Sequence, residues 1–121
     1  MQVRTVFIFK AIVSLLFGAL LLALPEATTA MFGVTLTAGG VLAARLYGAS
    51  ALGHACVTWY ARNAGPSDAR RAIILGGFVY DAIGFLLGLA AVLAGLTNPL
   101  GWLAVLLYLL LAVGFGYFFF R

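Results

Sequence analysis

The side chains that carry most enzyme chemistry are scarce in this chain. Its 121 residues include one cysteine, Cys56, one histidine, His54, and three carboxylates, Glu26, Asp68 and Asp81. A single cysteine excludes an intramolecular disulfide and a C-x-x-C redox pair. So few ligands also exclude a structural zinc site or a doubly ligated haem within one chain. We therefore expect no metal and no cofactor.

Charge and catalytic motifs are equally rare. Charged residues make up 8% of the chain, whereas a soluble domain has about 25%. The sequence contains no G-x-x-x-x-G-K-S/T, H-E-x-x-H or G-x-S-x-G motif, so phosphate-loop, metalloprotease and serine-hydrolase chemistry have no support. We assign no catalytic residue from the sequence.

What the chain does have is long apolar runs. Hydrophobic residues account for 65% of it, and the mean hydropathy is +1.18. Crossing a bilayer core of about 30 Å takes roughly 20 apolar residues as a helix. Four such spans use roughly 80–90 residues, which leaves only short turns. We predict one all-α membrane domain over residues 1–121, an integral bundle of four transmembrane helices.

The helix boundaries follow from local signals. The predicted spans are 4–24, 36–61, 68–96 and 99–120. Pro25 ends the first span, because proline cannot continue a helix without losing a backbone hydrogen bond, and residues 25–34 are expected to form a short connection. Thr35 or Thr37 is the expected cap of the second span, since a hydroxyl can accept from the free N–H groups of the first turn.

The third and fourth spans have similar start signals. Ser67 is the expected cap of the third, with Asp68 in the first turn, where a negative charge complements the helix dipole. Asn98 and Pro99 are expected to be the cap and the first helical residue of the fourth span.

The basic residues predict the orientation. Of the seven Lys and Arg residues, all but Arg45 fall at the two ends of the chain or near the turn at residues 62–71. In a four-span bundle these places lie on one face, and by the positive-inside rule that face is cytoplasmic, so both termini are predicted to be inside. The positive-inside rule therefore accounts for the net charge of +4. Since the basic residues need no further explanation, no nucleic-acid partner is expected.

Three ionisable residues are predicted to lie within the spans, and such residues mark a function or a paired contact. Counted at about 1.5 Å per residue from the cytoplasmic ends, His54 lies about 12 Å deep, Asp81 about 16 Å and Arg45 about 25 Å. Asp81 could bond to His54 or pair with Arg45. We favour Arg45, because an unpaired guanidinium in hydrocarbon costs more than a neutral imidazole. Lys10, about 9 Å deep, is expected to extend to the headgroups.

An Arg45–Asp81 pair has two interpretations. It is either a buried bridge that fixes two helices in register or a site for an ion, a proton or a lipid headgroup, and the small polar inventory favours the bridge. Tyr47, which shares a face with His54 at helical spacing, completes the set of candidate binding residues.

Small residues form a stripe on the third predicted helix. At about 100° per residue, one face carries Asp81 together with small residues: Gly77, Gly84, Gly88, Ala91 and Gly95. Such stripes let helix backbones approach closely. We therefore expect Asp81 to face a neighbouring helix, with packing inside the bundle favoured over a homo-oligomer interface.

Several segments are similar to known proteins. They are residues 44–49 (ARLYGA), 59–63 (WYARN), 70–73 (RRAI) after Ser67, and 98–102 (NPLGW). With these the chain resembles a group of small bacterial four-helix membrane proteins and, more loosely, the DoxX-like families. The resemblance implies a four-helix bundle in the bacterial inner membrane and carries no established activity. The small multidrug transporters have a similar size, but they carry an essential carboxylate in the first helix, where this chain has none.

Three functions fit these observations. The first is an accessory or structural subunit, packed in the lipid bilayer against itself or against other membrane chains. The second is a small transporter or a lipid- or ligand-binding bundle that uses Asp81, Arg45, His54 and Tyr47. The third is a membrane enzyme acting on a lipid, with Asp81 and His54 as acid and base. The sequence favours the subunit, because it has almost no loops and no motif that carries chemistry.

Overall fold

A computed structural model describes residues 2–121, and over this range the chain is entirely helical, with no strand. The helices are, in chain order, α1 (Val3–Ala23), α2 (Pro25–Met31), α3 (Ala38–Ala61), α4 (Asp68–Leu93) and α5 (Gly101–Phe120). The predicted all-α class is confirmed. The helices α1, α4 and α5 are long and apolar enough to cross a membrane. The fourth long helix, α3, has 24 residues but is more polar, since it carries Arg45, Tyr47 and His54.

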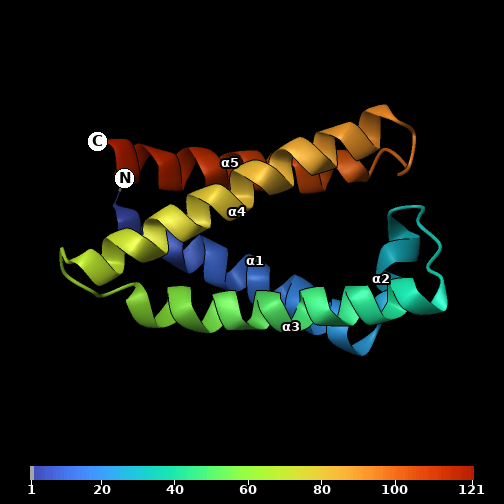
Figure 1. The fold of residues 1–121 in the computed structure, drawn as a ribbon, viewed down its shortest axis with the longest axis horizontal. Coiled ribbons are helices and arrows are strands. Elements are labelled where there is room, and N and C mark those ends of the chain that lie inside the picture. The colour runs from blue at the N-terminus through green and yellow to red at the C-terminus, as the bar shows by residue number, and fades with distance from the viewer. Residues whose placement is uncertain (1) are drawn as a thin grey trace.

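The long helices form two hairpins (Figure 1). The N-terminal hairpin consists of α1 packed along α3, and the C-terminal hairpin consists of α4 packed along α5. Both chain ends and the α3–α4 turn lie at one end of the molecule, which we call the terminal end. The short helix α2 and the α4–α5 turn lie at the opposite end, here called the α2 end.

Two of the expected helix caps are present. The Thr37 hydroxyl accepts from the backbone N–H of Gly40 at 3.0 Å, and Ser67 accepts from that of Arg70 at 3.1 Å. These bonds satisfy donors that have no partner inside the helix.

The connection after α1 differs from the prediction. The predicted short connection over residues 25–34 contains a helix of its own, α2, at residues 25–31. Pro25 stands in its first turn, where the missing N–H costs nothing. Gly33 ends it with a φ of +77°, a left-handed conformation that glycine adopts without strain.

The start of the last helix also differs. The helix α5 begins at Gly101 and not at Pro99, and Asn98 does not cap it. Instead, the Asn98 side chain donates to the carbonyl of Met31 at 2.9 Å and accepts from the N–H of Leu100 at 3.0 Å. Its backbone N–H donates to Phe32 at 2.9 Å. Asn98 therefore ties the α4–α5 turn to the end of α2, a contact between distant segments that local sequence cannot reveal.

Glycines set the spacing within the N-terminal hairpin. A Cβ atom at Gly48 of α3 would lie 2.8 Å from the carbonyl oxygen of Gly18 of α1. The two backbones are thus in direct contact, and neither position has room for a side chain.

The small-residue stripe of α4 faces α5. Cβ atoms at Gly77 and Gly84 would collide with the rings of Phe115 and Tyr108, so these glycines accommodate aromatic side chains. The stripe ends earlier than expected, because α4 stops at Leu93. Gly95 lies beyond it with a φ of +75° and closes the helix, and no atom of residues 2–121 would approach its Cβ within 4 Å.

The buried hydrophobic core that the two hairpins share lies at the terminal end. Their shared core there consists of Val6, Phe7, Ala61, Ile74, Leu111 and Phe115. Toward the α2 end, α4 diverges from α3 (Figure 1), and the direct contact between these two helices is slight. Between the hairpins toward the α2 end, the side chains leave a cavity.

Candidate binding cavity

A buried ion pair joins the two hairpins. Nζ of Lys10, on α1, lies 2.6 Å from Oδ1 of Asp81, on α4, and donates a hydrogen bond to it. Lys10 is 4% exposed and Asp81 is fully buried. Asp81 faces neighbouring helices, as the stripe predicted, but its partner is Lys10 and neither Arg45 nor His54.

The predictions for Arg45, as the partner of Asp81, and for Lys10, as a side chain that reaches the headgroups, were both wrong. Arg45 is exposed on α3 and forms no ion pair with any residue in the range 2–121. Lys10 does not extend to the surface, because it stands on the buried face of α1, in helical register with Ser14 and Gly18. The helical spacing of Lys10, Ser14 and Gly18 could have predicted a buried Lys10. It was not used because Lys10 lies close to the N-terminus, where a lysine is expected to reach the membrane surface.

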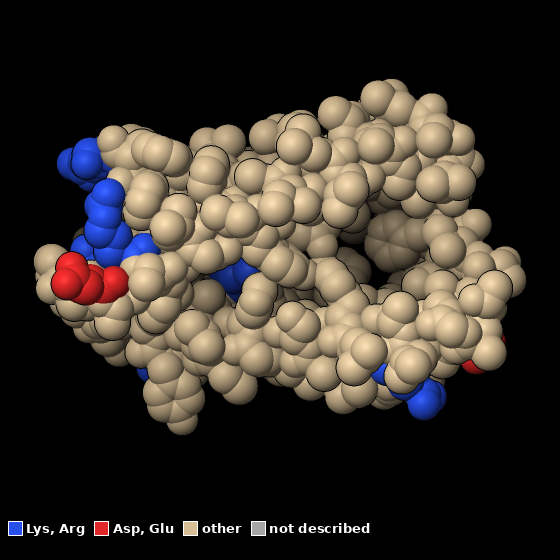
Figure 2. Space-filling view, viewed as in Figure 1, with Lys and Arg blue, Asp and Glu red and all other residues tan. Residues whose placement is uncertain are grey.

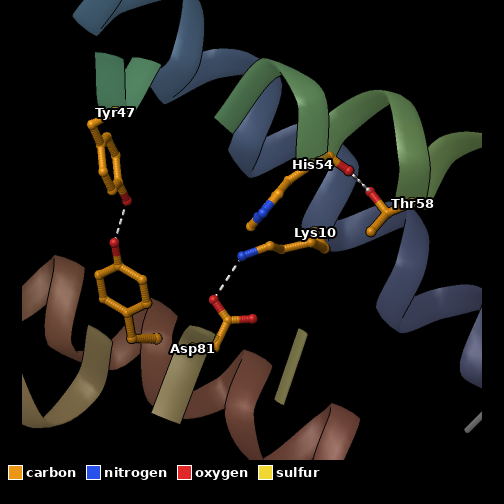
Figure 3. A network of polar contacts seen from close by, with 6 residues as sticks. Lys10, Tyr47, His54, Thr58 and Asp81 are labelled. Atoms are coloured by element: carbon orange, nitrogen blue, oxygen red, sulfur yellow. Dashed lines mark hydrogen bonds and ion pairs between the residues drawn. The ribbon is translucent and has the colours of Figure 1, made fainter. Parts of the chain in front are cut away.

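One oxygen of the Asp81 carboxylate has no partner within residues 2–121. Its second oxygen, Oδ2, is buried without a hydrogen-bond partner in the part of the chain that the structure describes. Figure 3 shows this oxygen pointing away from both Lys10 and Tyr47. The Lys10 ammonium also lies over the face of the Tyr80 ring, 4.4 Å from its centroid, where the electron-rich face attracts a cation.

Three tyrosines from three helices converge beside the ion pair. The hydroxyls of Tyr47 on α3 and Tyr108 on α5 are hydrogen-bonded to each other. The Tyr80 ring, on α4, has its centroid 6.4 Å from that of Tyr47 and 6.2 Å from that of Tyr108. Tyr47 was expected here. Tyr80 and Tyr108 were not among the predicted site residues, because their positions depend on how α4 and α5 are rotated.

His54 lies close to this cluster but forms no acid–base pair with Asp81. Its ring meets the Tyr80 ring edge-on at 4.6 Å, and its backbone carbonyl accepts from the Thr58 hydroxyl at 2.7 Å. No hydrogen bond joins it to Asp81 among the described residues, and its side chain is absent from the wall of the cavity described next. The geometry required for the lipid-enzyme hypothesis is therefore not formed.

A cavity of about 280 Å³ lies between the hairpins and extends from the ion pair toward the α2 end. Figure 2 shows the molecule hollowed there. The polar end of the wall holds the ion pair, Ser14 and the three tyrosines, and most of the remaining wall is apolar, with Phe17, Leu21, Phe32, Val92, Ala104 and Leu107. At about 1.5 Å per residue, the stretch of α1 from Lys10 to Leu21 is roughly 16 Å long. The cavity is thus elongated, with both charged side chains at one end. At the other end the hydroxyls of Thr28, Thr29 and Thr97 donate to backbone carbonyls.

A second hollow adjoins the polar end from outside. This groove, the tyrosine groove, is lined by Tyr47, Tyr80 and Tyr108 together with Ile83, Gly84, Leu87 and Gly88. Ile83 and Leu87 are exposed. The Tyr47–Tyr108 hydrogen bond lies in the wall of both hollows, so these two side chains lie between the cavity and the tyrosine groove.

The arrangement suits binding better than catalysis. Pockets for small molecules are mostly apolar with a few polar groups that orient the ligand. Nowhere in residues 2–121 do three His, Cys, Asp or Glu side chains come together to hold a metal ion. The wall could hold an elongated apolar molecule with one polar end. Comparison of the chain with protein-family models, with curated proteins and with solved structures gave no match.

Proposed function

We propose that this protein binds an amphiphilic small molecule between its two hairpins, within the membrane. The observation that carries the proposal is the cavity of about 280 Å³ with an apolar wall and one polar end. An apolar cavity of about 150 Å³ is large enough to hold benzene. The present cavity therefore has room for a short alkyl chain and a small head.

The membrane arrangement is part of the proposal. In it α3 is a fourth span, because it runs along α1 in backbone contact at Gly18 and Gly48. Its polar residues Tyr47 and His54 contact Tyr80 of α4. Arginines gather at the terminal end (Figure 2), which supports a cytoplasmic location for both termini. The resemblance to small bacterial membrane proteins supports the bacterial inner membrane as the location.

The bilayer is then the source of the ligand. The tyrosine groove opens between α3 and α4, beside exposed apolar side chains of α4 that would face lipid acyl chains. A molecule dissolved in the membrane reaches the polar end of the cavity from this side when the Tyr47–Tyr108 bond opens. Such a route requires no passage through water.

The other functions are less well supported. An accessory subunit held together only by packing requires no hollow, so the cavity favours the binding alternative, and the subunit stays a prediction. Transport would require the same cavity to open at both faces of the membrane.

The test is photolabelling in lipid nanodiscs with a decanol derivative that carries a diazirine on its chain, followed by peptide mass spectrometry. The label is expected on residues of the cavity wall, such as Phe17 and Leu107. Ala104→Phe fills the cavity from α5 and should abolish this labelling. The matched control is Leu103→Phe, which places the same ring on the outward face of α5, where Leu103 is 44% exposed.

The control separates binding from general contact with lipid. If Leu103→Phe retains the labelling of the cavity wall and Ala104→Phe loses it, the cavity is the binding site. Label confined to outward residues such as Leu15 and Leu16, and unchanged by Ala104→Phe, would contradict the proposal.

A further inference from the structure

The charges in the cavity wall cancel. Among the residues that line the cavity, Lys10 and Asp81 are the only ones with a charged side chain, and they are paired with each other at 2.6 Å. Arg45 of α3 is exposed and does not line the cavity. The wall therefore offers no net charge to a ligand.

We infer that the ligand is a neutral, single-chain amphiphile whose head carries an oxygen acceptor, such as a long-chain alcohol or a monoacylglycerol. The inference rests on the proposed function and adds the chemical class of the ligand. A charged head would leave one uncompensated charge in a site of low dielectric constant. Such a charge is costly unless it is paired and hydrogen-bonded.

The donors at the polar end select the kind of neutral head. An ammonium group has three N–H donors. One donates to Asp81 at 2.6 Å and another side of the group faces the Tyr80 ring, so a donor is left for a ligand oxygen. The tyrosine hydroxyls add further groups that can donate or accept. An alcohol, an ester or a ketone can accept from these groups, whereas a plain hydrocarbon cannot.

The size of the cavity selects a single chain. A volume of about 280 Å³ is less than twice that of a cavity of about 150 Å³ that holds benzene. A phospholipid with two acyl chains is several times larger. A single chain of moderate length, or the end of a longer one, fits.

The test compares three photoreactive decyl probes that differ only in the head: an alcohol, a sulfonate, which stays ionised, and a trimethylammonium group. In the wild-type protein the alcohol should label the cavity wall at least tenfold more than either charged probe. Cavity labelling by the sulfonate or the ammonium probe equal to that by the alcohol would overturn the inference, and this comparison requires no variant.

Variants of Lys10 and Asp81 should change which of the three probes labels the cavity wall most. Asp81→Asn leaves the wall with a net positive charge and should favour the sulfonate, and Lys10→Gln should favour the ammonium probe. The double variant Lys10→Gln/Asp81→Asn is neutral and should return to the alcohol. Single variants that fold, as judged by circular dichroism, yet keep the wild-type order would overturn the inference.

The two proposals fail in different ways. If all three probes label the cavity wall equally, the cavity binds chains without regard to the head, so the proposed function stands and the ligand class is wrong. If no probe labels the wall, both are wrong.

Discussion

Removing one member of the Lys10–Asp81 pair should destabilise the protein far more than removing both. Both side chains are almost completely buried and their charged atoms are 2.6 Å apart. Either Lys10→Met or Asp81→Leu leaves a buried charge without its partner, which costs about 3–5 kcal/mol in free energy of unfolding. The two single costs therefore add up to about 6–10 kcal/mol.

The double variant Lys10→Met/Asp81→Leu should be close to the wild type. It removes both desolvated charges and also the Asp81 Oδ2 atom, which has no partner among residues 2–121. Replacing a buried ion pair with apolar side chains of similar volume is often neutral, or stabilising by about 1–4 kcal/mol. The expected coupling free energy between Lys10 and Asp81 in this double-mutant cycle is thus several kcal/mol.

The assay is reversible unfolding in bicelles, followed by circular dichroism or by steric trapping, for all four members of the cycle. Arg45→Met is the control, because Arg45 is exposed and its loss should change stability by less than about 0.5 kcal/mol. Single variants that cost less than about 1 kcal/mol, or a double variant whose cost equals the sum of the single costs, would refute the buried pair.

Two further predictions concern the helices. Gly48→Ala should destabilise by about 1–3 kcal/mol, because the new methyl group meets the α1 backbone at Gly18. Gly53→Ala on the same helix has no atom of the described chain within 4 Å of the new Cβ and should be neutral or stabilising by up to about 1 kcal/mol, so equal losses in both would contradict the close crossing. Ser67→Ala should cost about 1 kcal/mol by removing the cap of α4, whereas Ser67→Asp should not, as chemical or thermal unfolding can show.

Local sequence was sufficient for most of the helical elements. Long apolar runs, Pro25 and the hydroxyls of Thr37 and Ser67 act within one or two helical turns, so the helices they delimit could be predicted without knowing what packs against them. The same holds for the face of Asp81, which follows from the positions of small residues on its own helix.

The partner of Asp81 depended on the tertiary structure. Counting residues from the membrane face gives the depth of a side chain but neither the rotation of its helix nor the offset between helices. Lys10 and Asp81 were predicted at different depths, yet the long Lys10 side chain extends from the buried face of α1 to Asp81 on α4.

The chain by itself thus determined that this is an all-helical protein with long apolar helices and very few polar groups to place among them. Only the tertiary structure decided which polar groups meet and where space is left. The physical reason is that burial of apolar surface favours many helix pairings about equally, while the backbone contact at Gly18 and Gly48 and the aromatic rings against Gly77 and Gly84 admit only particular rotations. Those rotations close the core at the terminal end and leave the cavity between the paired charges and the α2 end.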